Sequence, residues 1–295
     1  MNKTDRYFIE AIKDIRENGS WDEGPRPRYK DGTPAHTLSI NHVVRTYNLQ
    51  KEFPITSLRP IAWKSAIKEI LWIYKDQNAD LAIMEKKYNN YVWSEWDIGN
   101  RTIGQRYGAT VNRYDLMNKL IKGLIQNPDG RRHIMDLYQY TDLEETAGLY
   151  PCAFLTIWNV RYAGKQKYLD MMLVQRSGDM IVASGPGGYN EVQYAALQIA
   201  IANIVKMQPG KFTHVIANEQ IYDRHLNITN ELLDRYEKMD GALEKEPRLV
   251  LLHDILGDNY KDFPTSGFLN NLKIESFDLK NYSPYQPQLE LDIGI

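Results

Sequence analysis

The sequence predicts an α+β protein whose mixed, largely antiparallel sheet is covered by helices. Helical periodicity and strand-like segments both occur, but not in the regular alternation that a parallel α/β sheet requires. Two apolar strands flank a short turn that contains glycine, which indicates an antiparallel pair. With 43% hydrophobic residues, the 295-residue chain can bury a large core. Since no linker or repeat interrupts it, residues 1–295 are expected to form one domain.

The helices are predicted from apolar residues that recur every three or four positions. They are 5–18, 61–74, 115–126, 190–207 and 228–238. The pattern is strongest in 61–74, where one face carries Trp63, Ile67, Ile70, Leu71 and Tyr74. The pair Asn127-Pro128 ends the third helix, because proline cannot continue it.

The strands are predicted from short apolar or alternating runs between turn residues. They are 37–49, 133–137, 154–161, 168–174 and 211–218. Residues 163–165 join the third and fourth strands as a turn, while residues 20–32 are rich in proline, glycine and charge and are expected to form a loop. From residue 248 onward the chain predicts short strands with irregular connections.

Composition narrows the classes of function. The net charge of −2 gives no basis for a general nucleic-acid or membrane-surface binder. No apolar run reaches the length of a membrane span, and the N-terminus lacks the apolar segment of a secretion signal. A single cysteine is typical of a reducing compartment. These observations predict a cytoplasmic protein with no membrane association and no obligate nucleic acid.

The single cysteine, Cys152, is the first candidate for chemistry. It cannot belong to an internal disulfide, so it is either a packing residue or a nucleophile. Arg176 and Ser177 follow the strand 168–174. If this strand pairs with the one after Cys152, the guanidinium and the sulfur can meet, and a cation stabilises a thiolate.

Several segments together resemble the thymidylate synthase family over nearly the whole chain. The first matches are Asp31-Gly-Thr-Pro-Ala-His, Phe53-Pro-Ile-Thr, Glu69-Ile-Leu-Trp, Val92-Trp-Ser-Glu-Trp, Ile103-Gly and Tyr107-Gly. The later matches are Asn127-Pro-Asp-Gly-Arg-Arg, Leu149-Tyr-Pro-Cys, Gln175-Arg-Ser-Gly-Asp, Asn190, Tyr194, His214 and Ile221-Tyr. Each segment is a weak signal alone, but their shared order and spacing are specific.

The resemblance implies a methyltransferase of dTMP biosynthesis with the thymidylate-synthase-like fold. It would convert dUMP to dTMP with 5,10-methylenetetrahydrofolate as the donor of one carbon and a hydride, and without a metal. Cys152 matches the family nucleophile, which bonds to C6 of the pyrimidine and so activates C5. Arg176 matches the arginine that activates the sulfur and binds the nucleotide phosphate.

The resemblance also implies further substrate-binding residues. They are Arg28, Arg131, Arg132, Arg176, Ser177, Asn190, Gln220 and Tyr222. Arg131 and Arg132 would reach the phosphate across a homodimer formed through the sheet, so each site would need two chains. The early-loop arginine is either Arg26 or Arg28. Asn190 would read the uracil edge, because an amide can pair with both O4 and N3–H.

Glu69 and Tyr107 match the groups that manage protons around the pyrimidine. Burial among Ile67, Ile70 and Leu71 is expected to raise the pKa of Glu69. The residues that would hold the folate are Trp93, Trp96, Leu149, Asp179 and the terminal Ile295. The last of these belongs to a tail that would close over the ligands.

Three departures from the family pattern leave other functions open. Ala153 stands where the family usually has histidine, residues 183–190 form a longer glycine-rich loop, and Gln220 replaces a histidine. The same chemistry could end in a pyrimidine nucleotide hydroxymethylase if water reached the site. A catalytically silent nucleotide-binding relative is the other alternative.

Overall fold

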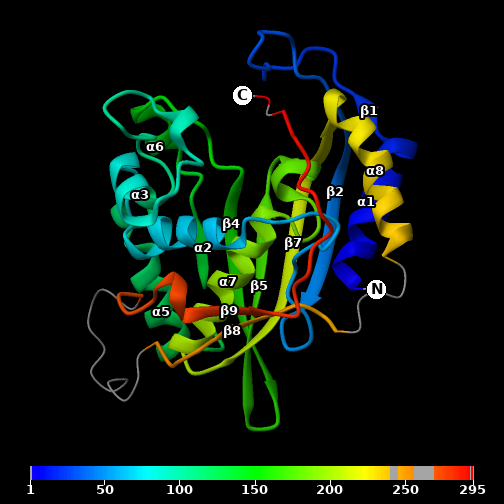
Figure 1. Cartoon of the computed structure of the whole chain (residues 1–295). Helices are drawn as coiled ribbons and strands as arrows, with labels where there is room; N and C mark the ends of the chain where they lie inside the picture. The colour runs from blue at the N-terminus through cyan, green and yellow to red at the C-terminus, as the bar shows by residue number, and fades with distance from the viewer. Residues whose placement is uncertain (1, 240–244, 256–268, 293, 295) are drawn as a thin grey trace.

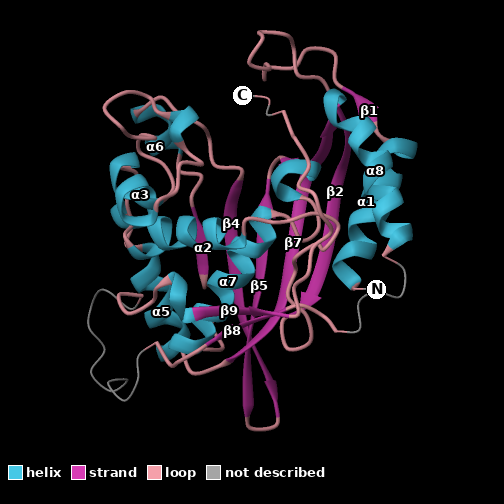
Figure 2. Ribbon diagram, viewed as in Figure 1, coloured by secondary structure: helices cyan, strands magenta, loops and turns pink. Residues whose placement is uncertain are grey.

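A mixed sheet forms the centre of the molecule. The computed structural model describes residues 2–239, 245–255, 269–292 and 294. Within them, the strand order is β1-β2-β7-β5-β4-β3, and β6 pairs with β7 (Figures 1 and 2). The strands are β1 (Ser20–Trp21), β2 (Thr37–Asn48), β3 (Ile134–Asp136), β4 (Ala153–Ala163), β5 (Gln166–Gln175), β6 (Gly178–Asp179) and β7 (Gln208–Tyr222). Only the β5–β7 and β6–β7 pairs are parallel among these described strands, which confirms the predicted fold class.

Helices pack against part of the sheet. They are α1 (Lys3–Asn18), α2 (Trp63–Ile70), α3 (Leu81–Tyr88), α4 (Gly108–Arg113), α5 (Leu116–Gln126), α6 (Tyr140–Glu145), α7 (Tyr189–Ile204) and α8 (Leu226–Lys238). The shorter helical turns are η1 (Leu71–Lys75), η2 (Ser94–Trp96), η3 (Met180–Ser184), η4 (Asp223–His225) and η6 (Ile274–Ser276). A small separate pair is formed by β8 (Arg248–Leu251) and β9 (Phe277–Lys280).

Every helix and strand predicted before residue 248 is present. The helix predicted over 61–74 is α2 continued by the π-helical turn η1. The helices α3, α4 and α6 were not predicted, because six to eight residues give too little periodicity. The predicted loop 20–32 contains the two-residue strand β1 at its start.

The two layers of helices bury different parts of the sheet. Helix α7 packs against β5 and β7 with α2 beside it, whereas α1 and α8 lie together next to β2 (Figure 1). Almost all of α7 is buried, which explains its continuous apolar sequence. Side chains on the opposite face of the central strands are open, including Val44 on β2 (60% exposed) and Met172 on β5 (39%).

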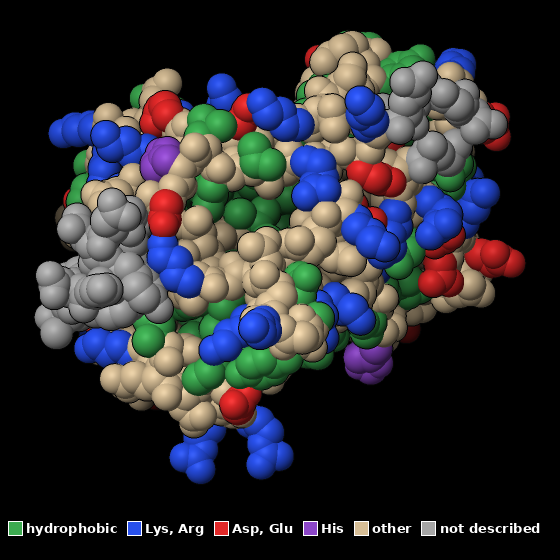
Figure 3. Space-filling model, turned by 90° about the horizontal axis from the view of Figure 1, so that it is seen from below, with side chains coloured by type: hydrophobic (Ala, Val, Ile, Leu, Met, Phe, Trp, Pro, Cys, Tyr) green, Lys and Arg blue, Asp and Glu red, His purple; other side chains and the backbone are tan. Residues whose placement is uncertain are grey.

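None of the described helices combines the length and the apolar character needed to cross a bilayer. Seen from below, lysine and arginine side chains are spread over the surface with acidic side chains among them (Figure 3).

Candidate active site

A cavity of about 610 Å³ lies among α2, the start of α7 and the ends of β5 and β7. It collects most of the predicted site residues from segments far apart in the sequence. Those that line it are Glu69, Trp93, Trp96, Tyr107, Leu149, Cys152, Arg176, Ser177, Asp179, Asn190, Gln220 and Tyr222. A cavity of this size suits small-molecule ligands.

Cys152 and Arg176 meet because β4 and β5 pair. Ala153 and Gln175 are register partners, and the backbone N–H of Arg176 donates to the carbonyl of Cys152 at 2.9 Å. The Nη2 group of Arg176 then donates to Sγ of Cys152 at 3.4 Å. This confirms the expected pairing of the two strands and brings the cation to the sulfur. Nε of the same guanidinium donates to the carbonyl of Pro151 at 2.9 Å, which fixes its orientation.

Burial and charge act in opposite directions on the thiol. Burial raises the pKa of Cys152 above its ordinary value, while Arg176 and Arg26 lower it. The net direction is upward, so the thiol keeps its proton near neutral pH.

Tyr107 contacts the backbone of Cys152. Its hydroxyl oxygen accepts a hydrogen bond from the backbone N–H of Cys152 at 3.2 Å. Burial raises the pKa of Tyr107 well above its ordinary value, with the nearby Cys152 adding to the effect, so the phenol stays neutral. The residue immediately precedes α4 and has a positive φ of 44°, an uncommon backbone conformation for a tyrosine.

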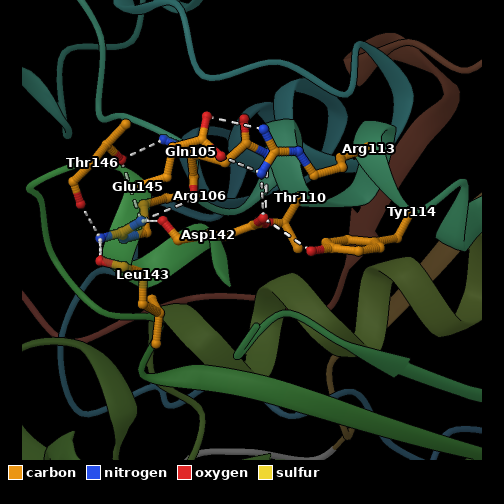
Figure 4. A network of polar contacts seen from close by, with 9 residues as sticks. All are labelled: Gln105, Arg106, Thr110, Arg113, Tyr114, Asp142, Leu143, Glu145 and Thr146. Carbon is orange, nitrogen blue, oxygen red and sulfur yellow. Dashed lines mark hydrogen bonds and ion pairs between the residues drawn. The ribbon is translucent and has the colours of Figure 1, made fainter. Parts of the chain in front are cut away.

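A polar network beside Tyr107 holds this backbone in place (Figure 4). The guanidinium of Arg106 donates to the carbonyls of Asp142 (2.5 Å), Leu143 (3.1 Å) and Thr146 (2.6 Å) at the end of α6. The Asp142 carboxylate in turn accepts from Arg113 of α4 at 2.7 Å. The network therefore joins α4 to α6. It also supports Tyr107, the residue with the positive φ that precedes α4.

Glu69 projects from α2 into the cavity and is only 6% exposed. Burial raises the pKa of its carboxyl group, as the sequence predicted, and the polar side chains of Gln193, Trp93 and Tyr189 act in the opposite direction. The carboxyl group is thus poised to hold a proton at a higher pH than an exposed glutamate.

Asn190 lies near the N-terminus of α7 and has a defined amide orientation. Its Oδ1 accepts from the hydroxyl of Ser184 at 2.8 Å, and its Nδ2 donates to Oε1 of Gln193 at 2.9 Å. Ser184 ends the turn η3, and Gln193 lies one turn along the same helix. The amide is therefore held from both sides.

Four more predicted residues line the wall formed by β6, β7 and the residue before β6. The Ser177 hydroxyl donates to Oε1 of Gln220 at 3.4 Å. Burial raises the pKa of Tyr222 to about 12, so its hydroxyl remains a neutral donor. Asp179 caps the turn η3 by accepting from the N–H groups of Ile181 (3.1 Å) and Val182 (3.0 Å), and burial raises the pKa of its carboxyl group.

Four predicted residues are not among those lining the cavity. Arg28 donates to the carbonyl of Gly32 at 3.0 Å instead, whereas its alternative, Arg26, does line the cavity. Arg131 and Arg132 are exposed in the loop before β3. Ile295 lies outside the described residues, but Gly294 next to it lines the cavity.

Several polar residues of the cavity were not predicted from the sequence. They are Gln175, Ser184, Tyr189 and Gln193. Gln175 stands in the recognised Gln-Arg-Ser-Gly-Asp segment, and Gln193 lies three residues after Asn190, on the same face of a helix. These two sequence positions are the features from which a role in the site could have been predicted. In the part of the chain that is described, no three His, Cys, Asp or Glu side chains gather as metal ligands would.

Comparison with known proteins identifies the family. The family model described as thymidylate synthase matches residues 6–295. A thymidylate synthase from Lactococcus lactis subsp. lactis (strain IL1403) is 46% identical over 297 residues, which cover all of both chains. One from Streptococcus thermophilus (strain ATCC BAA-491 / LMD-9) is 43% identical over 304 residues, again with both chains fully covered.

A solved structure agrees with these matches. The thermostable thymidylate synthase A from Bacillus subtilis superposes with a TM-score of 0.82 at 29% identity, covering 99% of each chain. The fold thus agrees with that of a solved thymidylate synthase, and the sequence matches relatives over their full length. The chain belongs to the thymidylate synthase family.

Proposed function

We propose that this protein converts dUMP to dTMP, with 5,10-methylenetetrahydrofolate as the donor of the one-carbon unit and the hydride. The observation that carries the proposal is the 3.4 Å hydrogen bond between Arg176 and the sulfur of Cys152 inside a cavity that also contains Asn190. The names of the full-length relatives support the same reaction. We further propose that residues 1–295 act as one catalytic domain in the cytoplasm.

Cys152 is proposed as the nucleophile. Its sulfur forms a bond to C6 of the pyrimidine and gives up its proton, while the electron pair of the C5–C6 double bond moves toward C5 and O4. Glu69, whose raised pKa lets it retain a proton, stabilises the charge that develops on O4. The neutral hydroxyl of Tyr107 belongs to the proton network that later removes the hydrogen from C5.

The phosphate of the nucleotide is assigned to arginines and Ser177. Nε and Nη2 of Arg176 already contact Pro151 and Cys152, so Nη1 is the group left for an anion. Arg26 is preferred to Arg28 as the early-loop arginine, because Arg26 lines the cavity and lowers the pKa of Cys152.

Asn190 is assigned to the uracil edge. The ribose hydroxyl is assigned to Tyr222 and Gln220, which lie side by side in the wall of the cavity. Both residues can donate a hydrogen bond, and the pKa of Tyr222 keeps its proton in place.

The folate is assigned to the apolar end of the cavity. Trp93, Trp96 and Leu149 offer flat and apolar surface there, and Asp179 is a carboxyl group that can bind a ring N–H. When bound, the folate supplies the carbon and the hydride.

The C-terminal tail, including Ile295, is proposed to close this end of the cavity. Asp292 pairs with Arg224 at 3.0 Å, and Gly294 follows it at the cavity wall. Closure would exclude water from the carbon that is transferred.

A homodimer through the open sheet face is also proposed. Ile134, Ile157 and Met172 are neighbours in one row across β3, β4 and β5, and Val174 and Val215 follow in the next row. An apolar face that no described helix covers favours a second copy of the chain. Arg131 and Arg132, exposed before β3, would then reach the phosphate of the partner's site.

Product analysis tests the reaction. The protein is incubated with dUMP and methylenetetrahydrofolate, and both products are identified. The expected products are dTMP and dihydrofolate, whose formation raises the absorbance. Formation of 5-hydroxymethyl-dUMP with release of tetrahydrofolate would instead identify a hydroxymethylase, the alternative that the altered 183–190 loop keeps open.

A further inference from the structure

Behind the proposed uracil-reading residue, Asn190, lies a buried chain of polar side chains. It runs from Glu191 through His214, Gln175 and Ser184 to Asn190. The first four side chains are at most 2% exposed. His214 and Glu191 are not among the cavity-lining residues, so they do not touch a ligand there directly.

The direction of each hydrogen bond in this chain follows from a backbone group that cannot change its role. Nε2 of Gln175 lies 2.9 Å from the carbonyl oxygen of Ser177, which can only accept. The nitrogen of the Gln175 amide must therefore point to Ser177, and its oxygen must point to Nε2 of His214, 3.0 Å away. It follows that His214 carries a proton on Nε2.

The other end of the chain is fixed in the same way. The backbone N–H of Gly187 can only donate, and it lies 2.6 Å from Oε2 of Glu191. Oε1 of Glu191 then faces Nδ1 of His214 at 3.1 Å, and one proton lies between them. Whichever of the two groups carries that proton, Nε2 of His214 still donates to Gln175.

The orientation passes on to Asn190. Both hydrogens of Gln175 Nε2 are used, one toward Ser177 and one shared between the oxygen of Ser184 at 2.7 Å and Oδ1 of Asn190 at 3.3 Å. The hydroxyl hydrogen of Ser184 is thus directed to Oδ1 of Asn190 at 2.8 Å. On the other side, Nδ2 of Asn190 donates to Gln193 at 2.9 Å. A flipped Asn190 amide would lose both hydrogen bonds.

We propose that His214 and Glu191 are positioning residues that make this enzyme choose uracil over cytosine nucleotides. They hold the Asn190 amide with its nitrogen on the side of Gln193, whose oxygen accepts from it and whose side chain also acts on the Glu69 carboxyl group. The amide nitrogens of Asn190 and Gln193, both in the cavity wall, can donate to the carbonyl oxygen at position 4 of uracil. Cytosine has an amino group at that position, which is itself a donor, so these two amides disfavour it. This inference rests on the proposed function and assigns its base specificity.

The experiment compares dissociation constants for dUMP and dCMP in the wild type and three variants. His214→Phe removes the donor to Gln175 but keeps an aromatic ring over Phe212, on which His214 stacks with an interplanar angle of 22°. Ser184→Ala removes the shorter of the two contacts through which this chain reaches Asn190, leaves the 3.3 Å contact from Gln175 Nε2, and alters little volume. Glu191→Gln is the matched control, because its amide oxygen can still accept from Gly187 and its nitrogen can donate to Nδ1 of His214.

His214→Phe and Ser184→Ala are each expected to lower the ratio of dUMP to dCMP affinity by about tenfold, as the loss of one buried hydrogen bond would. Glu191→Gln should keep that ratio within about twofold of the wild type, since it keeps every hydrogen-bond direction. If these residues only stabilised the fold, the substitutions would weaken the binding of dUMP and of dCMP equally. The inference would be overturned if both Ser184→Ala and a folded His214→Phe kept the wild-type ratio of dUMP to dCMP affinity. It would also be overturned if the control, Glu191→Gln, lowered this ratio as much as they do. A wild type that binds neither nucleotide would instead refute the proposed function.

Discussion

The guanidinium of Arg176 donates a hydrogen bond to the sulfur of Cys152 at 3.4 Å. The contact follows from the register of β4 and β5, in which the two residues flank the pair Ala153 and Gln175. The same guanidinium is held by the carbonyls of Tyr150 and Pro151, so its charge stays beside the sulfur. The charge of Arg176 thus lowers the pKa of the thiol, against the larger effect of burial, which raises it.

Replacing Arg176 by glutamine should raise the pKa of Cys152 further. Glutamine keeps amide donors for the carbonyls but removes the charge, and a rise of one unit would slow alkylation at neutral pH by about tenfold. The rate of reaction with iodoacetamide, measured against pH, gives the pKa directly. Arg101→Gln, at an exposed arginine paired with Glu85, is the matched control and should leave the curve unchanged. An unmoved curve in Arg176→Gln would show that burial alone sets the pKa.

Replacing Glu69 by glutamine should lower activity and raise stability at neutral pH. Loss of a proton-transferring group costs about 10²- to 10⁴-fold in kcat. Because the folded-state pKa of Glu69 is raised above its ordinary value of 4.5, its contribution to stability is complete below that value and is lost as pH rises through the folded-state pKa. The gain in Tm of the variant over the wild type should therefore be larger at pH 8 than at pH 4.

Thermal unfolding at both pH values checks the stability of the Glu69 variant. Glu10→Gln, on the exposed face of α1, should give no pH-dependent difference. A Glu69→Gln variant whose Tm difference shrinks as pH rises would mean that the carboxyl group is stabilised in its charged form.

The sequence predicted the parts of the site that lie in short motifs. Cys152 and Arg176 were recognisable because each sits at the end of a strand whose partner is its neighbour along the chain. Glu69 was predicted to be buried because apolar residues flank it on one helix. In both cases local sequence carries the structural information.

Contacts between distant segments could not be predicted in this way. The choice between Arg26 and Arg28 depends on a turn in which Arg28 binds the carbonyl of Gly32, and nothing in the local sequence distinguishes the two arginines. The chain from Glu191 to Gln175 passes through His214 on β7, so it exists only once the sheet and α7 have packed together. Side-chain hydrogen bonds of this kind have no sequence periodicity to reveal them.

The proposed dimer predicts that two inactive variants restore activity when they are mixed. One variant is Cys152→Ala, and the other carries both Arg131→Ala and Arg132→Ala. In random mixing half of the dimers are hybrids, and each hybrid has one complete site of two, so activity should return to about a quarter of the wild type. Steady-state rates after unfolding and refolding the mixture provide the measurement.

A mixture of the two inactive variants that stays inactive would place both arginines in the site of their own chain. Lys167→Ala in place of the arginine changes is the control, since Lys167 is a half-buried cation on β5 and does not lie before β3. It should be active alone.

Gly187 gives a stability test of the loop that replaces the usual family turn. Its φ is +68°, and a Cβ atom there would lie 2.2 Å from the backbone nitrogen of Thr56. Gly187→Ala should therefore lose stability through both the left-handed backbone and the clash, about 3 kcal/mol in all. Gly164 is the matched control, because its φ is +59° but no atom lies within 4 Å of the added Cβ.

Gly164→Ala should cost only the conformational part, about 1 kcal/mol. Urea unfolding of the two variants separates the contributions, and equal losses would mean that the loop moves away from Thr56 at no cost. The Gly187 variant should also bind dUMP more weakly, because the N–H of Gly187 anchors Glu191 at 2.6 Å. A shift of that N–H disturbs the chain of hydrogen bonds that orients Asn190, so the loss of stability and the loss of nucleotide affinity have one structural cause.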